Sequence, residues 1–121
     1  MTQLILHLIG DYITQSHWMA TQKTTRSIPA LVHATIYSAP FLLIGSLRAV
    51  FIIWFTHFWI DRFRLARYVV FAKNHLGWPQ PKWADCSVTG FSSDVPAWLA
   101  VWLLIIVDNT MHLAINWMAL R

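Results

Sequence analysis

Three histidine–aspartate pairs lie inside long apolar segments of this chain, and they constrain its fold more than any other feature. In each pair the two residues are four apart, which places them on one face of a helix. Ionisable side chains are costly inside a membrane, where they usually face one another or mark a functional site. The pairs therefore predict helices that pack with these faces inward. They are His7 with Asp11, His57 with Asp61 and, in reversed order, Asp108 with His112.

The composition is typical of a membrane protein. Hydrophobic residues make up 57% of the chain and charged residues 12%, whereas ordinary soluble domains carry about 25% charged residues. A length of 121 residues predicts a single membrane domain over residues 1–121. The formal net charge of +4 suits an anionic membrane surface, so we expect membrane lipids as partners and no nucleic acid.

Four apolar segments predict an all-α fold, an integral membrane four-helix bundle, because a spanning helix needs about 17–25 mainly apolar residues. Gly45 and Ser46 predict a tight hairpin between the second and third helices, and Pro40 predicts a kink late in the second. Residues 73–95 are expected to form a cytoplasmic loop at the membrane interface. The predicted helices cover about residues 4–20, 28–44, 47–72 and 98–120.

The basic residues predict the orientation of the bundle. Most of them lie after the first segment, at the end of the third segment and in the loop that follows it, and only Arg48 and Arg121 fall on the other side. By the positive-inside rule, the two basic connections are cytoplasmic and both termini lie outside the cytoplasm. The residues on the cytoplasmic side are Lys23, Arg26, Arg62, Arg64, Arg67, Lys73 and Lys82.

The three pairs are predicted to lie at matching depths. With a helical rise of about 1.5 Å per residue, Asp11 and Asp61 lie roughly 16 Å and Asp108 roughly 18 Å from the cytoplasmic boundary. Their histidine partners lie one turn further outward, and the reversed order in the last pair is what an antiparallel helix requires. His33 is predicted about 8 Å from that boundary, as a ligand, a supporting group or a proton shuttle.

This arrangement predicts an intramembrane metal site. Imidazole and carboxylate groups are ligands for Zn, Mn and Fe, and so many of them exceed the needs of one tetrahedral ion. We therefore interpret the site as a divalent metal centre that binds Zn or Mn/Fe and has room for two ions. In this centre Asp11, Asp61 or Asp108 is expected to act as general base toward a metal-activated water. The expected ligands are His7, Asp11, His33, His57, Asp61, Asp108 and His112.

Four further residues are candidates for binding a substrate. Arg62 and Arg64 follow Asp61, and arginine side chains match phosphate and carboxylate groups, although basic residues also flank many transmembrane helices. Gln15 continues the stripe of His7 and Asp11, and Asn109 follows Asp108, so either amide could orient a ligand or contact substrate.

Two explanations without a metal centre of this kind remain open. One is a hydrogen-bonded polar core that holds the helices together. The other is a b-type haem held by two histidines, in which an aspartate one turn from each histidine has no role.

Several motifs resemble those of a known family. They are His7-Leu-Ile-Gly-Asp11, His33-Ala-x-x-Tyr37, Thr56-His57-Phe-x-Ile-Asp61 and Asp108-Asn-x-x-His112. In this order, over nearly the whole chain, they resemble the DUF3307 family of small bacterial and phage membrane proteins. The resemblance implies a multi-pass protein of the bacterial inner membrane, similar to the phage-associated branch. A looser similarity of pattern is to the YdjM-like family, described as membrane-bound metal-dependent hydrolases.

Three functional hypotheses follow. The first is a membrane-embedded, metal-dependent hydrolase that acts on a lipid or lipid-linked anionic phosphoester. The second is a non-enzymatic, metal-stabilised phage membrane protein that binds or blocks a host membrane component. The third is a metal or proton conductor. The sequence leaves homo-oligomerisation open.

Overall fold

The structure, a computed structural model, describes residues 1–76 and 82–121. Every regular element within these residues is helical, as predicted. Two compact units are present: Met1–Phe63 with His112–Arg121, and Arg64–Met111. Residues 77–81, which belong to the predicted interfacial loop 73–95, lie outside the described residues.

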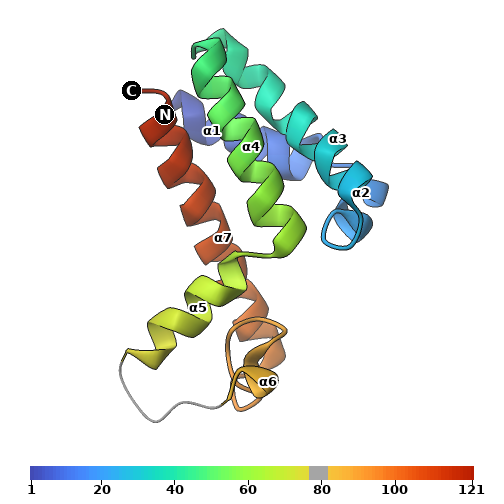
Figure 1. Ribbon diagram of the computed structural model, residues 1–121, viewed down its shortest axis with the longest axis vertical. Helices are drawn as coiled ribbons and strands as arrows, with labels where there is room; N and C mark the ends of the chain where they lie inside the picture. The colour runs from blue at the N-terminus through green and yellow to red at the C-terminus, as the bar shows by residue number, and fades with distance from the viewer. Residues whose placement is uncertain (77–81) are drawn as a thin grey trace. The chain divides into compact units, whose positions relative to one another are not determined.

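The first unit is built around a helical hairpin (Figure 1). Helices α3 and α4 pack side by side and are joined by a turn at Gly45 and Ser46, as predicted. The Ser46 hydroxyl accepts a hydrogen bond from the Ala49 amide at 3.2 Å and so caps α4. Near Pro40 the α-helix gives way to a 3-10 helix, because proline cannot donate a helical hydrogen bond. The elements are α1 (Thr2–Leu8), the π-helix η1 (Ile9–Ile13), α2 (His17–Gln22), α3 (Ser27–Ser38), the 3-10 helix η2 (Ala39–Leu43), α4 (Leu47–Phe63) and the end of α7 (Ala97–Ala119).

The predicted first helix, residues 4–20, is not continuous in the structure. It breaks between η1 and α2, where the Thr14 hydroxyl donates to the Gly10 carbonyl at 3.1 Å. The Ser16 hydroxyl then accepts from the Met19 amide at 3.4 Å and starts α2. Serine and threonine hydroxyls compete in this way with helical backbone bonds.

The predicted third helix, residues 47–72, is also two helices. Helix α4 ends at Phe63 and α5 (Ala66–His75) follows. Arg64 lies between them with a φ of 52°, in the left-handed region that residues other than glycine rarely occupy. Its guanidinium donates to the Val88 carbonyl at 2.7 Å, and this contact supports the break.

The second unit holds α5, α6 (Trp83–Cys86) and the first part of α7. Arg67 donates to the Ser87 carbonyl at 2.9 Å, and the Tyr68 and Trp83 rings stack with centroids 4.8 Å apart. Gly90 has a φ of 85°, and a Cβ atom there would lie 2.3 Å from the Arg67 carbonyl oxygen. Only glycine fits this position.

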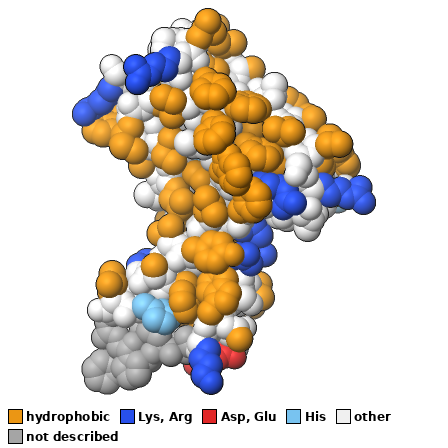
Figure 2. All heavy atoms as spheres, in the orientation of Figure 1, with side chains coloured by type: hydrophobic (Ala, Val, Ile, Leu, Met, Phe, Trp, Pro, Cys, Tyr) orange, Lys and Arg blue, Asp and Glu red, His pale blue; other side chains and the backbone are white. Residues whose placement is uncertain are grey.

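The first unit buries several polar side chains and exposes many apolar ones. A ladder of aromatic side chains runs along the outer face of α4, each ring contacting the next at centroid distances of 6.1, 6.0 and 4.8 Å. Figure 2 shows hydrophobic side chains over much of this face of the protein. The ladder consists of Phe51, Phe55, Trp59 and Phe63, all exposed.

Among the described helices, α7 is the one that is both long enough and apolar enough to cross a membrane. It matches the predicted fourth helix, residues 98–120, within a residue at each end. The other predicted spans are shorter helices in the structure, so the four-helix membrane bundle stays a prediction.

Candidate metal centre

Four buried side chains from three helices meet inside the first unit. Asp11 comes from the π-helix η1, His33 from α3, and His57 and Asp61 from successive turns of α4. All four are at most 7% exposed. Their ligand atoms lie within 4.8 Å of one another, so this buried group could hold a metal ion.

The distances within this cluster fit a tetrahedral ion. His33 Nε2 is 3.1 Å from Asp11 Oδ1 and 3.2 Å from Asp61 Oδ2. His57 Nε2 is 3.4 and 3.2 Å from the same two oxygens, and the two nitrogens are 3.0 Å apart. Metal–ligand bonds of about 2.0–2.1 Å in a tetrahedron place neighbouring ligand atoms about 3.3 Å apart. The five distances given above, between 3.0 and 3.4 Å, are close to this value.

Hydrogen bonds alone do not account for the arrangement around His33. A ring nitrogen of histidine either donates one proton or accepts one. His33 Nε2 nevertheless has both carboxylate oxygens, His57 Nε2 and, at 3.2 Å, Lys23 Nζ around it. The Lys23 ammonium has no lone pair, but the two carboxylates and the two imidazoles can direct lone pairs toward one point, as a metal ion requires.

The remaining oxygen of each carboxylate faces another histidine. His7 Nδ1 lies 3.5 Å from Asp11 Oδ2, and His112 Nε2 lies 3.4 Å from Asp61 Oδ1. Both histidines are buried. They can fix the orientation of the two carboxylates, as groups behind metal ligands commonly do.

Tyr37 connects these groups, although no role in the site was predicted for it. Its hydroxyl lies 2.8 Å from His7 Nδ1 and accepts from Asn116 Nδ2 at 2.7 Å. Its ring stacks on His57 with centroids 3.6 Å apart. Tyr37 follows His33 by four residues, and this helical spacing is the signal that could have indicated it.

Lys23 is the second residue that was not predicted as part of the site. Its ammonium lies 2.7 Å from Asp61 Oδ2, and its side chain is 17% exposed. From the sequence it was assigned only to the basic flank of a helix. In the structure it supplies a positive charge to the buried carboxylate of Asp61.

Glycine allows the first helix to approach α3 closely. A Cβ atom on Gly10 would lie 2.5 Å from Cδ2 of Tyr37. Gly10 and Asp11 both lie in the π-helix, and such single π turns occur frequently at functional sites. The position of Asp11 therefore depends on this irregular turn and on the absence of a side chain before it.

The remaining predicted site residues are not among the four side chains of this cluster. Asp108 and Asn109 are on the part of α7 that belongs to the second unit, with Asp108 one turn before His112. Arg64 bonds to Val88, as described above. Gln15 lies in the break between η1 and α2.

Arg62, by contrast, lies in the first unit with the cluster. It donates from Nε to the Ser27 hydroxyl at 3.3 Å and from Nη1 to the Thr24 carbonyl at 3.1 Å. It thereby ties the end of α4 to the turn between α2 and α3.

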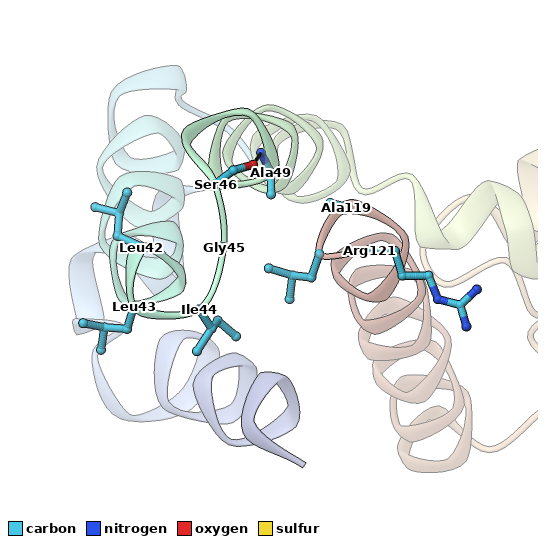
Figure 3. A pocket seen from close by; sticks show the side chains of 9 residues that line it. Leu42, Leu43, Ile44, Gly45, Ser46, Ala49, Ala119 and Arg121 are labelled. Atoms are coloured by element: carbon cyan, nitrogen blue, oxygen red, sulfur yellow. Dashed lines mark hydrogen bonds between the residues drawn. The ribbon is translucent and has the colours of Figure 1, made fainter.

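A pocket of about 390 Å³ lies at the turn between η2 and α4, beside the end of α7 (Figure 3). No His, Cys, Asp or Glu is among its lining residues. Its one charged side chain, Arg121, points away from the turn in Figure 3 and has its Cζ 3.4 Å from the centre of the Trp117 ring. This pocket therefore offers none of the ligands found in the cluster.

The chain belongs to the family described as "Protein of unknown function (DUF3307)", whose model matches residues 1–120. The resemblance seen in the motifs is thus confirmed, while the looser similarity to YdjM-like proteins stays a prediction. No curated protein and no solved structure gives a significant match to the chain.

Proposed function

We propose that this protein is a membrane-embedded, metal-dependent hydrolase whose substrate is a lipid or lipid-linked phosphoester. The observation that carries the proposal is the buried cluster of Asp11, His33, His57 and Asp61, whose ligand atoms have the spacing of a metal coordination shell. Burying two carboxylates is costly unless a cation compensates them.

The membrane setting is supported by the distribution of side chains. Exposed aromatic residues follow the outer face of α4, whereas the ionisable groups of the first unit's cluster are buried. Lipid would solvate such an apolar surface, and water would not. We place the protein in the bacterial inner membrane with several crossings and both termini outside the cytoplasm, because the basic residues then lie inside.

The chemistry follows from the residues at the cluster. A bound divalent ion would supply a water of lowered pKa, about 7 in known cases. In the hydrolysis, a P–O bond to the water oxygen would form as the ester P–O bond broke. Asp11 or Asp61 would take the proton from the water and return a proton to the leaving oxygen. His7 and His112 hold the outer oxygens of these carboxylates in place.

The four ligands also favour a second candidate function, a non-enzymatic and metal-stabilised membrane protein that a phage uses to bind or block a host component. Four protein ligands fill every position of a tetrahedral zinc ion, as in structural zinc sites. Catalysis needs an open position. A six-coordinate ion such as Mn²⁺ would leave two positions for water and substrate.

The hydrolase proposal is tested with purified, metal-loaded protein and a panel of phospholipids and polyprenyl phosphates. Hydrolysis should stop with chelator, return with added divalent ion, and be lost in Asp11→Asn and Asp61→Asn. The exposed carboxylate of Asp85 provides the matched control, and Asp85→Asn should retain activity. If metal-loaded protein releases nothing from the whole panel, the non-enzymatic role replaces the hydrolase.

A further inference from the structure

A cleft of about 460 Å³ opens at the turn between α2 and α3, within the first unit. One part of its lining is apolar and includes the exposed side chains of Trp18 and Ile28. The rest is polar or basic. The lining residues are Trp18, Gln22, Thr25, Arg26, Ser27, Ile28, Pro29 and Arg62.

The cleft carries two guanidinium groups and no carboxylate among its lining residues. The guanidinium of Arg26 makes no hydrogen bond or ion pair with any residue in the described part of the chain, and this side chain is exposed. Arg62 is held by Ser27 and Thr24 through Nε and Nη1, which leaves Nη2 for a ligand. Guanidinium donors match the oxygens of a phosphate group.

An unsatisfied acceptor lies in the same lining. The Gln22 amide oxygen is buried, and no described residue donates a hydrogen bond to it. Buried polar atoms usually have a partner. A phosphate group cannot supply that partner unless it carries a proton, but a hydroxyl group beside the phosphate can.

The chain connects this cleft directly to the metal cluster. Arg62 follows the ligand Asp61 on α4. Gln22 precedes Lys23, whose ammonium is 2.7 Å from Asp61 Oδ2. A phosphate group held by the two arginines would therefore be bound next to residues that contact the cluster.

We propose that this cleft binds the phosphate headgroup of an anionic membrane lipid, one whose headgroup carries a net negative charge, with Arg26 and Arg62 on the phosphate and Trp18 and Ile28 against the apolar part of the lipid. The cleft's mixture of apolar wall and guanidinium groups fits an amphiphile better than a free anion. The assignment of this cleft as the substrate site of the enzyme rests on the proposed function. Binding of the lipid, however, does not require hydrolysis.

Binding is measured on full-length protein in detergent, stripped of metal by chelator so that no hydrolysis occurs. Calorimetric titrations use dihexanoyl phosphatidic acid, dihexanoyl phosphatidylcholine and inorganic phosphate. Phosphatidic acid should saturate one site at least about tenfold more tightly than either of the others. Arg26→Gln should weaken that binding by about tenfold or more, since one charge-assisted contact is lost.

Arg48→Gln is the matched control, because Arg48 is an exposed arginine of the first unit outside the cleft. It should leave binding unchanged. Arg62→Gln adds a second test, although it also removes bonds to Ser27 and Thr24. Arg26 makes no such bonds, so a folding defect in the Arg62 variant leaves the main test intact.

Three results would overturn the proposal: equal affinity for the two lipids, equally tight binding of inorganic phosphate, or equal losses in the Arg26 and Arg48 variants. The outcome is separable from that of the hydrolase. Specific lipid binding without hydrolysis in metal-loaded protein would refute the hydrolase proposal and support the binding proposal for the cleft. Hydrolysis without this binding would support the hydrolase proposal and refute the binding proposal.

Discussion

Lys23 places its ammonium group against the same carboxylate oxygen of Asp61 that a metal ion would use. Two buried carboxylates with neutral histidines carry two negative charges, and one lysine offsets only half of this charge. A divalent ion would offset it fully and would repel the ammonium. Lys23 and a metal ion bound by the cluster would therefore compete for this position.

Replacing Lys23 by methionine should raise the affinity for divalent metal by about tenfold or more, because the competing cation is removed. The same change should lower the melting temperature of metal-free protein, whose carboxylates lose their counter-charge. Competition titration with a chelating dye measures the affinity. Lys73→Met, in the second unit, is the control. An unchanged or weaker metal affinity in the Lys23 variant would contradict the competition.

Cys86 is a buried thiol of the second unit, and burial together with the neighbouring Asp85 raises its pKa above the ordinary value. A raised pKa leaves little thiolate at neutral pH, and the thiolate fraction grows as pH rises. We expect alkylation by iodoacetamide to be slower at pH 7 than for a free cysteine peptide and to accelerate toward pH 10. Reaction at pH 7 as fast as that of the peptide would show that the thiol is not shielded.

At the scale of single elements, the π-helix η1 sets the geometry of the cluster. It brings Asp11 against α3, and the close approach depends on Gly10. In Gly10→Ala the new methyl group would collide with the buried ring of Tyr37, which itself stacks on His57. Relief of that collision requires either the ring or η1 to move.

We expect Gly10→Ala to destabilise the protein by about 1–3 kcal/mol, the usual range for overpacking, and to weaken metal binding. Gly45→Ala is a suitable comparison, because its new Cβ would meet the flexible end of Leu120 at 2.7 Å. That side chain can shift at small cost. Thermal unfolding and metal titration of both variants test this expectation. Equal losses of stability and of metal affinity in the two variants would show that the close approach at Gly10 does not position the cluster.

The elements also show what the sequence could predict. Residues 98–120 were recognised as one helix because no breaker interrupts them, and Gly45 with Ser46 marked the hairpin turn. The break at Arg64 carries neither glycine nor proline, and it depends on a tertiary contact with Val88. Such a contact leaves no local signal.

The same distinction applies to the cluster. The pairs of His7 with Asp11 and His57 with Asp61 were visible because their spacing is local. His33 was predicted as a ligand, a supporting group or a proton shuttle, and its place beside Asp11 and Asp61 depends on how α3 packs. Lys23 looked like an ordinary flanking charge, since only the fold brings it to Asp61.

At the scale of the whole molecule, the account requires a protein that is solvated by lipid. Single-cysteine variants test the predicted topology in a Cys86→Ser background. Thr2→Cys and Arg121→Cys should react with a membrane-impermeant maleimide in intact cells. Ala84→Cys should react only after the inner membrane is opened. Protection of either terminal position until the membrane is opened would reverse the topology.

The central claim is that the buried cluster of Asp11, His33, His57 and Asp61 binds a divalent metal ion. Elemental analysis of detergent-purified protein tests it most directly, after exhaustive dialysis against trace Zn²⁺, Mn²⁺ and Fe²⁺. We predict about one or two ions per chain in the natural protein, near zero in Asp61→Ala, and an unchanged value in Asp85→Ala. Circular dichroism confirms that each sample is helical. Folded natural protein that holds no metal, or Asp61→Ala that holds as much, would contradict the claim.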